Sequence, residues 1–334
     1  MTALTSSAVG LMLSTRECGM PKFKKAPPDA GQRGILAHPQ PREIRTVYSA
    51  DGTALHVREY GHPALDPIVL IHGWSVAIEF WNPQINALAS GNRVIAYDQR
   101  GHGRSDAGTR PFSDRVLAED LSAVLAATVT PEAPATVVGH SMGGATVLAW
   151  AKYFRDDVLR YVDSALLANT ATGLSDGPEG MKRHQDRLSR WMIALAMAPL
   201  PSPPRRLTRS IFRRASLTPQ APVCMVDFVQ RVGATCPPRV RSQWAKVVQR
   251  IDASEGVKAL RVPTTVLYGA LDGLLPPRES ARTAQMVRAA GHLDREVVLA
   301  DSGHASNVQN ADEFNAEIVR LRGLSSRPIG LTSI

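Results

Sequence analysis

Short apolar runs alternate with amphipathic helical segments along most of this chain. Two alternating runs, 43–49 and 54–59, flank the turn dipeptide Asp51-Gly52 and predict an antiparallel hairpin. Buried strands are expected at six further runs rich in apolar and β-branched residues: 67–72, 93–97, 135–140, 161–168, 264–269 and 295–300. Because strands that alternate with helices form right-handed crossovers, the pattern predicts an α/β fold with a mostly parallel, eight-stranded sheet and helices on both faces.

The alternation breaks between residues 171 and 261, where only helical patterns occur. The chain is therefore predicted to have a core formed by 43–170 and 262–324, with a helical insertion at 171–261. Apolar side chains recur at helical spacing in two stretches of the insertion: Leu188, Trp191, Met192 and Leu195, then Val240, Trp244, Val247, Val248 and Ile251.

Composition narrows the class of protein. The chain has 334 residues, 44% of them hydrophobic, which suits a soluble globular enzyme with one large core. The cysteines at 18, 224 and 236 are widely spaced and fit neither a metal-ligand pattern nor a disulfide framework. No apolar run approaches the roughly 20 residues that span a bilayer. We expect a cytoplasmic protein without a metal, whose residues 1–42 form a poorly ordered extension; a targeting or surface-anchoring role for this extension stays open.

The positive charge is concentrated in the predicted insertion. Residues 171–262 hold 16 Lys and Arg against 6 Asp and Glu, whereas the whole chain has a net charge of +9. Arginines of two amphipathic segments lie opposite the apolar faces: Arg183, Arg187 and Arg190, and Arg206, Arg209 and Arg213. Such faces are typical either of solvated helices packed on a core or of peripheral contact with anionic lipid. No recognised motif accompanies the charge, so no nucleic-acid partner is expected.

The segment 137–144 contains the pattern Gly-x-Ser-x-Gly, with Ser141 at its centre. An apolar, β-branched strand precedes it and an Ala-rich helical pattern follows it. Glycines at 139 and 143 remove side chains that would collide across such a sharp turn, which exposes the serine hydroxyl at the edge of the sheet. The context favours a nucleophile elbow over an ordinary glycine-rich turn.

An elbow serine needs a base and an orienting acid, which follow it in the chain. The predicted strand at 264–269 leads to Asp272, and the predicted strand at 295–300 leads to His304. Serine is a weak nucleophile at its usual pKa, so His304 would accept its proton and Asp272 would orient the imidazole. Asp301 is a rival acid, but it lies only three residues before His304 and cannot easily reach around the ring.

An oxyanion hole completes the predicted constellation. The backbone amide of Met142 directly follows the nucleophile, and the strand at 67–72 ends in a His-Gly turn that places the amide of Trp74 as a second donor. The alternative for Trp74 is a large aromatic side chain that only fills the core.

These motifs, in this order, resemble those of the α/β-hydrolase family over about residues 45–321. The landmarks are His72-Gly73-Trp74, the segment 98–105, the elbow, Gly269-x-x-Asp272 with Pro276, and Gly303-His304. The resemblance implies that 98–105 shapes the loop beside the oxyanion turn. It also implies that 171–261 is a helical cap that covers the active site and selects the substrate, with Trp191 and Leu195 as expected substrate contacts.

The nucleophile limits the chemistry. Relatives that open epoxides or displace halide use aspartate at the elbow, whereas serine favours acyl transfer to water. We expect a serine hydrolase of the carboxylesterase or lipase type, without a cofactor, acting on a small-molecule ester with an apolar or lipid-like acyl chain. The alternatives are a cofactor-free perhydrolase resembling haloperoxidases, a carbon–carbon bond hydrolase, and a non-enzymatic ligand-binding protein on the same fold.

Overall fold

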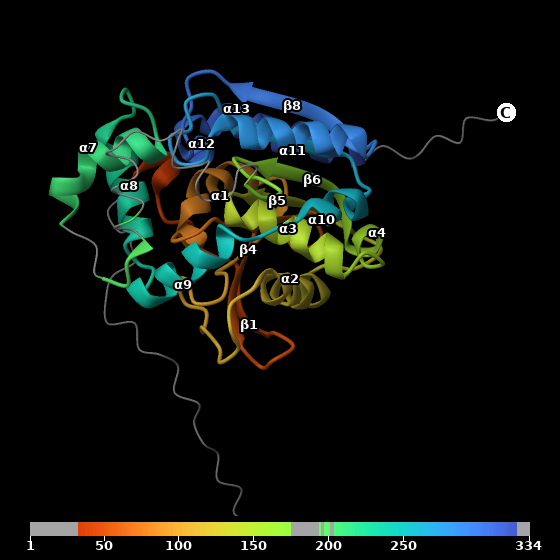
Figure 1. Cartoon of the computed structure of the whole chain (residues 1–334). Helices are drawn as coiled ribbons and strands as arrows, with labels where there is room; N and C mark the ends of the chain where they lie inside the picture. The colour runs from red at the N-terminus through yellow and green to blue at the C-terminus, as the bar shows by residue number, and fades with distance from the viewer. Residues whose placement is uncertain (1–32, 175–193, 195–196, 201–203, 326–334) are drawn as a thin grey trace, which may run out of the picture.

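The computed structural model describes residues 33–174, 194, 197–200 and 204–325 (Figure 1). Eight strands form one sheet in the order β1-β2-β4-β3-β5-β6-β7-β8. β1 and β2 form the antiparallel hairpin that the sequence predicts, β2 also runs antiparallel to β4, and the remaining neighbours are parallel. The strand bounds are Glu43–Tyr48 (β1), Ala54–Tyr60 (β2), Pro67–Ile71 (β3), Arg93–Tyr97 (β4), Ala135–His140 (β5), Val162–Ala168 (β6), Thr264–Gly269 (β7) and Leu293–Leu299 (β8).

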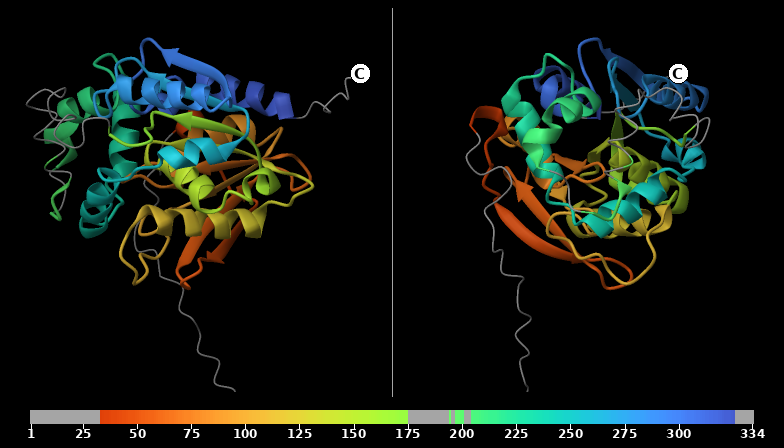
Figure 2. Two further views of the ribbon diagram at one scale, coloured as in Figure 1. Left: turned by 45° about the vertical axis from the view of Figure 1, so that its right-hand side comes forward. Right: turned by 60° about the vertical axis from the view of Figure 1, so that its left-hand side comes forward.

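Helices cover both faces of the sheet (Figure 2). One core layer packs strand side chains against α2, α3, α10 and α11, and the other packs them against α1 and α13. The side chains of the central strands β3 and β5 are buried on both faces of the sheet. The bounds are Asn82–Leu88 (α1), Asp114–Thr128 (α2), Met142–Tyr153 (α3), Val158–Tyr161 (α4), Ser254–Leu260 (α10), Pro277–Ala289 (α11), Ser306–Gln309 (α12) and Ala311–Ser325 (α13); the short 3-10 helices are Gly34–Leu36 (η1) and Ile78–Trp81 (η2).

Three helices of the predicted cap stand at the carboxyl end of the parallel strands. They are α7 (Arg205–Ser216), α8 (Val223–Gly233) and α9 (Pro238–Val248). α7 and α8 share an apolar cluster with η2 and with Ala305 of the loop after β8. α10 also falls within 171–261, but it packs closely on α3 of the core, where Gly256 lies so near Leu148 that a Cβ would be 1.9 Å from its carbonyl oxygen.

The segment 33–37 differs from the predicted poorly ordered extension. Leu36 is buried, and the side-chain amide of Asn82 donates to its carbonyl oxygen at 3.1 Å. Asn86 donates to the carbonyls of Ile35 and Ala37. Two asparagines of α1 therefore hold these residues on the core, a tertiary contact that leaves no periodic pattern in the sequence.

Candidate active site

Ser141 lies in the sharp turn between β5 and α3. Its backbone has φ 54° and ψ −118°, a conformation that residues with a Cβ rarely adopt. The flanking glycines permit this turn: a Cβ at Gly143 would lie 2.0 Å from the carbonyl oxygen of Ile71, and one at Gly139 would lie 2.6 Å from that of Gly143. The strand–turn–helix geometry of the predicted elbow is present.

The structure brings Ser141, Asp272 and His304 together. Nε2 of His304 lies 3.1 Å from Oγ of Ser141, and Nδ1 of His304 lies 2.7 Å from Oδ2 of Asp272. Since the carboxylate can only accept, Nδ1 carries the proton and Nε2 is left as the acceptor for the serine hydroxyl. Asp301, the rival acid, is exposed and does not contact the ring.

Asp272 is held in place by further donors. The backbone amides of Leu274 and Leu275 donate to its Oδ1 at 2.9 and 2.8 Å. The side chain of Asn169 donates to its Oδ2 at 3.1 Å and to the carbonyl of Gly303 at 3.3 Å. Sequence reasoning missed Asn169, although an asparagine directly after an apolar strand is a residue that tolerates the left-handed φ of 45° found here.

The turn of residues 72–75, which carries the predicted oxyanion donor Trp74, abuts the elbow. A Cβ at Gly73 would lie 3.1 Å from Cβ of Ser141, so the two turns are in contact. Within the described part of the chain, the backbone amides of Trp74 and Met142 donate to no protein acceptor. The indole of Trp74 is partly buried and donates to the carbonyl of Arg241 in α9 at 2.8 Å, which ties this turn to the cap.

Two buried histidines act as hydrogen-bond acceptors on either side of the turn at residues 72–75. Nε2 of His102 accepts from the amide of Ser75 at 3.1 Å, and Nε2 of His72 accepts from the amide of Gln99 at 2.9 Å. Burial lowers the pKa of His72 to about 4 and that of His102 to about 3, from a usual 6.5. Both rings are therefore neutral at pH 7, as their acceptor role requires.

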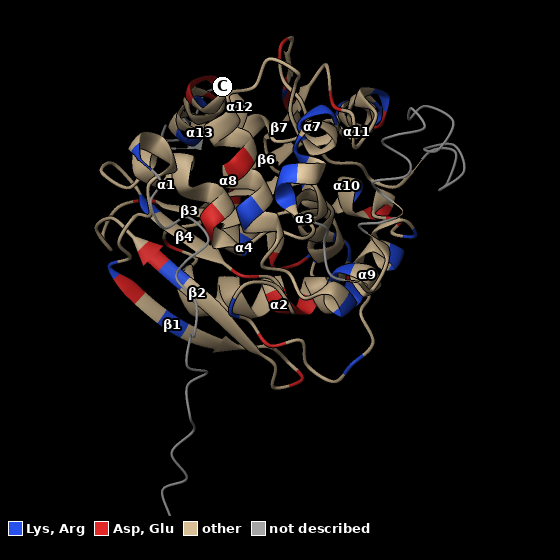
Figure 3. Ribbon diagram, turned by 90° about the vertical axis from the view of Figure 1, so that its left-hand side faces the viewer, with Lys and Arg blue, Asp and Glu red and all other residues tan. Residues whose placement is uncertain are grey.

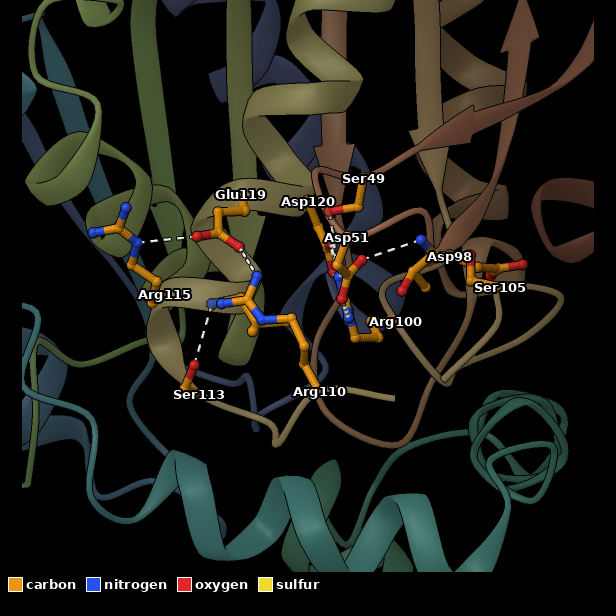
Figure 4. A network of polar contacts seen from close by, with 12 residues as sticks. Ser49, Asp51, Asp98, Arg100, Ser105, Arg110, Ser113, Arg115, Glu119 and Asp120 are labelled. Carbon is orange, nitrogen blue, oxygen red and sulfur yellow. Dashed lines mark hydrogen bonds and ion pairs between the residues drawn. The ribbon is translucent and has the colours of Figure 1, made fainter. Parts of the chain in front are cut away.

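The loop 98–105 has the structural role that the family resemblance implies. Asp98 accepts from the amides of Ile78 and Arg104 at 2.8 and 2.9 Å. Figure 4 shows the guanidinium of Arg100 between two carboxylates, 2.6 Å from Asp51 and 2.6 Å from Asp120. This buried network holds the loop that carries His102, and no member of it contacts Ser141.

Two cavities flank Ser141, and both are also lined by Trp74, Leu274 and His304. The first, of about 110 Å³, extends toward the cap and toward α3. Its other lining residues include Leu174, Met197, Val248, Ile251 and Leu275. The second, of about 140 Å³, extends toward η2, α7 and α8. The expected substrate contacts Trp191 and Leu195 lie outside the described residues, and the sequence did not identify the other lining residues as substrate contacts.

Comparisons with known proteins identify the family of this chain. The family model described as alpha/beta hydrolase fold matches residues 66–311, so the chain belongs to the α/β-hydrolase family. It is 28% identical to a non-heme haloperoxidase of Rhodococcus erythropolis, over 82% of this chain and 97% of that protein. It is 25% identical to a bifunctional esterase/perhydrolase of Acinetobacter calcoaceticus, over 72% and 87%. A solved esterase from Rhodococcus sp. ECU1013 superposes with a TM-score of 0.66 and 26% identity, covering 85% of this chain and 98% of that one.

The protein thus belongs to a family of hydrolases. None of the helices in the described ranges combines the length and the apolar character that crossing a bilayer requires.

Proposed function

We propose that this protein is a serine hydrolase that cleaves a carboxylic ester with an apolar acyl chain through an acyl-enzyme. The observation that carries the proposal is the continuous hydrogen-bonded line from Ser141 through His304 to Asp272, with distances of 3.1 and 2.7 Å. The esterases among its relatives support ester hydrolysis in particular.

In the proposed mechanism, Oγ of Ser141 attacks the ester carbonyl while Nε2 of His304 accepts its proton. The amides of Trp74 and Met142 donate to the oxyanion, and Asp272 stabilises the imidazolium. His304 then protonates the leaving alcohol. Water deprotonated by the same nitrogen attacks the acyl-enzyme, and Ser141 recovers its proton as the acid leaves.

The first cavity supports an apolar acyl chain. Its walls are largely aliphatic, and it opens directly beside Ser141. Its polar side chains are engaged elsewhere: Thr170 donates to the carbonyl of Ser141, and Gln249 donates to the carbonyl of Ala245. An acyl chain there would gain burial of its apolar surface.

Hydrolysis of p-nitrophenyl esters from acetate to palmitate tests the proposal. We expect turnover that peaks at medium or long chains and labelling by a fluorophosphonate probe, with both lost in Ser141→Ala. Full esterase activity in Ser141→Ala would refute the mechanism. An unlabelled, inactive wild-type protein would instead support the non-enzymatic alternative.

Perhydrolysis is a second candidate activity, favoured by the haloperoxidase and the esterase/perhydrolase among the relatives. The same acyl-enzyme would be attacked by hydrogen peroxide, which gives a peracid in place of the acid. Peracid formed from an ester and hydrogen peroxide can be detected by its oxidation of bromide, and Ser141→Ala should abolish it.

We also propose that α7 contacts anionic lipid at the surface of the cap. Leu207 is 75% exposed, and Arg206 and Arg214 are exposed on the same helix. Figure 3 shows basic residues on α7 and α9 around the carboxyl end of the sheet. An exposed leucine among arginines suits the interface of a membrane better than free solvent.

A further inference from the structure

The second cavity, which extends from Ser141 toward η2, α7 and α8, takes no part in the proposed mechanism. Its volume is about 140 Å³. Its apolar walls are formed by Val76, Phe80, Phe212, Val229 and Ala305. An apolar cavity of about 150 Å³ can hold a benzene ring. The second cavity therefore has room for one ring-sized apolar group.

Most polar side chains on the described wall of this cavity are engaged or covered. The hydroxyl of Ser75 donates to the carbonyl of Gly233 at 3.2 Å, and Nε2 of His140 donates to the carbonyl of His304 at 2.8 Å. Nδ1 of His140 is buried and has no partner among the described residues. The backbone of Gly73 crowds this atom, since a Cβ at Gly73 would lie 3.0 Å from it, so no ligand reaches it. A group bound in this cavity therefore makes mainly apolar contacts.

The proposed reaction at Ser141 needs space for two substrate groups. In the tetrahedral intermediate, the former carbonyl carbon is bonded to Oγ of Ser141, the oxyanion, the acyl chain and the alcohol oxygen. The oxyanion faces the predicted donors Trp74 and Met142. The acyl chain and the alcohol group extend away from this centre, and the two cavities that share Ser141 as a lining residue offer a space for each.

The surroundings of His304 distinguish the two cavities. In the proposed mechanism His304 protonates the leaving alcohol, so the alcohol oxygen lies on the His304 side of the intermediate. The wall of the second cavity includes Ala305, which directly follows His304, and His140, whose ring centroid lies 5.0 Å from that of His304. The wall of the first cavity includes Met142 and Ala145 of α3 instead. The second cavity is thus the one that continues along the imidazole.

We propose that the second cavity binds the alcohol group of the ester and prefers a single apolar ring, such as a benzyl or cyclohexylmethyl group. The inference rests on the proposed esterase function and adds a substrate class to it: esters that join an apolar acyl chain to a ring-bearing alcohol. Trp74 and Leu274 line both cavities and therefore lie where the acyl and alcohol groups diverge.

Four esters of butanoic acid test the preference: the ethyl, butyl, cyclohexylmethyl and benzyl esters. After normalisation to alkaline hydrolysis rates, kcat/KM of wild type for both ring esters should exceed that for the ethyl ester by about tenfold or more, because the ring is removed from water in the cavity. Both ring esters should also exceed the butyl ester. Ring-to-ethyl ratios near one, or a butyl ester preferred over both ring esters, would overturn the proposal.

Three substitutions to leucine locate the effect. Gly233 lines the second cavity, and outside its own helix a Cβ there would meet only the carbonyl oxygen of Ser75, at 3.7 Å. Gly233→Leu should therefore fill the cavity and reduce the ring-to-ethyl ratio to near one. Ala245→Leu fills the first cavity, so it should lower the hexanoate-to-butanoate ratio of ethyl esters and change the ring-to-ethyl ratio by less than about twofold. Ala234→Leu, at an exposed position that lines neither cavity, should retain both ratios.

The variants can also contradict the assignment. Retention of the ring preference in folded Gly233→Leu would show that the ring does not occupy the second cavity. Loss of the ring preference in Ala245→Leu would place the alcohol group in the first cavity. Circular dichroism checks folding, and the wild-type ratios and Ala245→Leu stay decisive if Gly233→Leu does not fold.

Binding separates this inference from the proposed function. In Ser141→Ala, titration calorimetry should give a dissociation constant about tenfold lower for benzyl butanoate than for ethyl butanoate, and adding Gly233→Leu should remove the difference. If no ester is turned over by wild type but this difference persists, the esterase proposal fails and the ring-binding cavity stands. If esters are turned over without any ring preference, the subsite fails and the esterase proposal stands.

Discussion

The loops at the carboxyl end of the sheet hold their polar side chains in buried hydrogen bonds, whereas helix α7 of the predicted cap leaves side chains exposed to solvent. Asp272 and His304 are each 7% exposed, and every polar contact between them and Asn169 is buried. On α7, in contrast, Leu207 is 75% exposed and Arg209 pairs with Asp227 at a half-exposed site. The geometry of Ser141, His304 and Asp272 is therefore fixed by the core, whereas α7 presents a surface whose side chains can change with little effect on that geometry.

The largest expected effect comes from the buried acid. Asp272→Asn removes the charge that fixes the proton on Nδ1 of His304, and kcat should fall by about 10⁴-fold with little change in KM. The matched control is Asp301→Asn, at the exposed rival acid, which should retain activity. Steady-state kinetics with p-nitrophenyl butyrate distinguishes them, and equal losses would show that Asp272 is not the orienting acid.

Low pH should lower the free energy of unfolding, because three buried histidines are neutral in the folded protein. The pKa values of His72, His102 and His140 are lowered to about 4, 3 and 3, so below about pH 6.5 the unfolded chain binds protons that the folded chain does not. Stability is fully present above pH 6.5 and is lost as the pH falls toward the folded pKa. Each histidine should remove about 1.4 kcal/mol per pH unit from the free energy of unfolding.

Urea unfolding at pH 7 and pH 5 measures this loss. His102→Gln should be less stable at pH 7 but should show a shallower dependence on pH. An equal free energy of unfolding at the two pH values would contradict the neutral, buried state of these rings.

Replacement of Asn169 should have a smaller effect, mainly on kcat. Asn169→Ala removes the donor that joins Asp272 to the loop of Gly303, and kcat should fall about tenfold or more while KM stays nearly constant. A purely structural role would lower the melting temperature without this selective loss of kcat. Ser306→Ala is the milder comparison, since Ser306 contacts only the carbonyl side of the Asn169 amide and not Asp272.

The smallest effect on chemistry is expected at the cap surface. The double variant Arg206→Ser, Leu207→Ser should hydrolyse a soluble short-chain ester within about twofold of wild type, because neither side chain lines a cavity at Ser141. Its co-sedimentation with vesicles that contain anionic lipid should drop severalfold. Thr208→Ser on the same helix is the control, and unchanged sedimentation of the double variant would refute the lipid contact.

Much of the sheet could be predicted because its central strands are short, continuous apolar runs, as expected of parallel strands that are buried on both faces. The predicted strands at 93–97, 135–140 and 264–269 match β4, β5 and β7. The last strand begins at Leu293 rather than 295, since the edge strand β8 is only partly buried and its polar residues conceal the boundary. The asparagine contacts that hold 33–37 on α1 could not be predicted, because a single side chain that bonds a distant backbone has no period.

The sequence by itself determined the family, the parallel sheet and the identity of Ser141, Asp272 and His304 as residues that would meet. These follow from local patterns: a strand, a turn that only glycine permits, and polar residues at strand ends that share one edge of the sheet. Only the tertiary structure placed Asn169 against Asp272 and left Nδ1 of His140 without a partner beside Ser141. Hydrogen bonds depend on distance and direction in space, and residues more than a hundred positions apart acquire both only when the chain is packed.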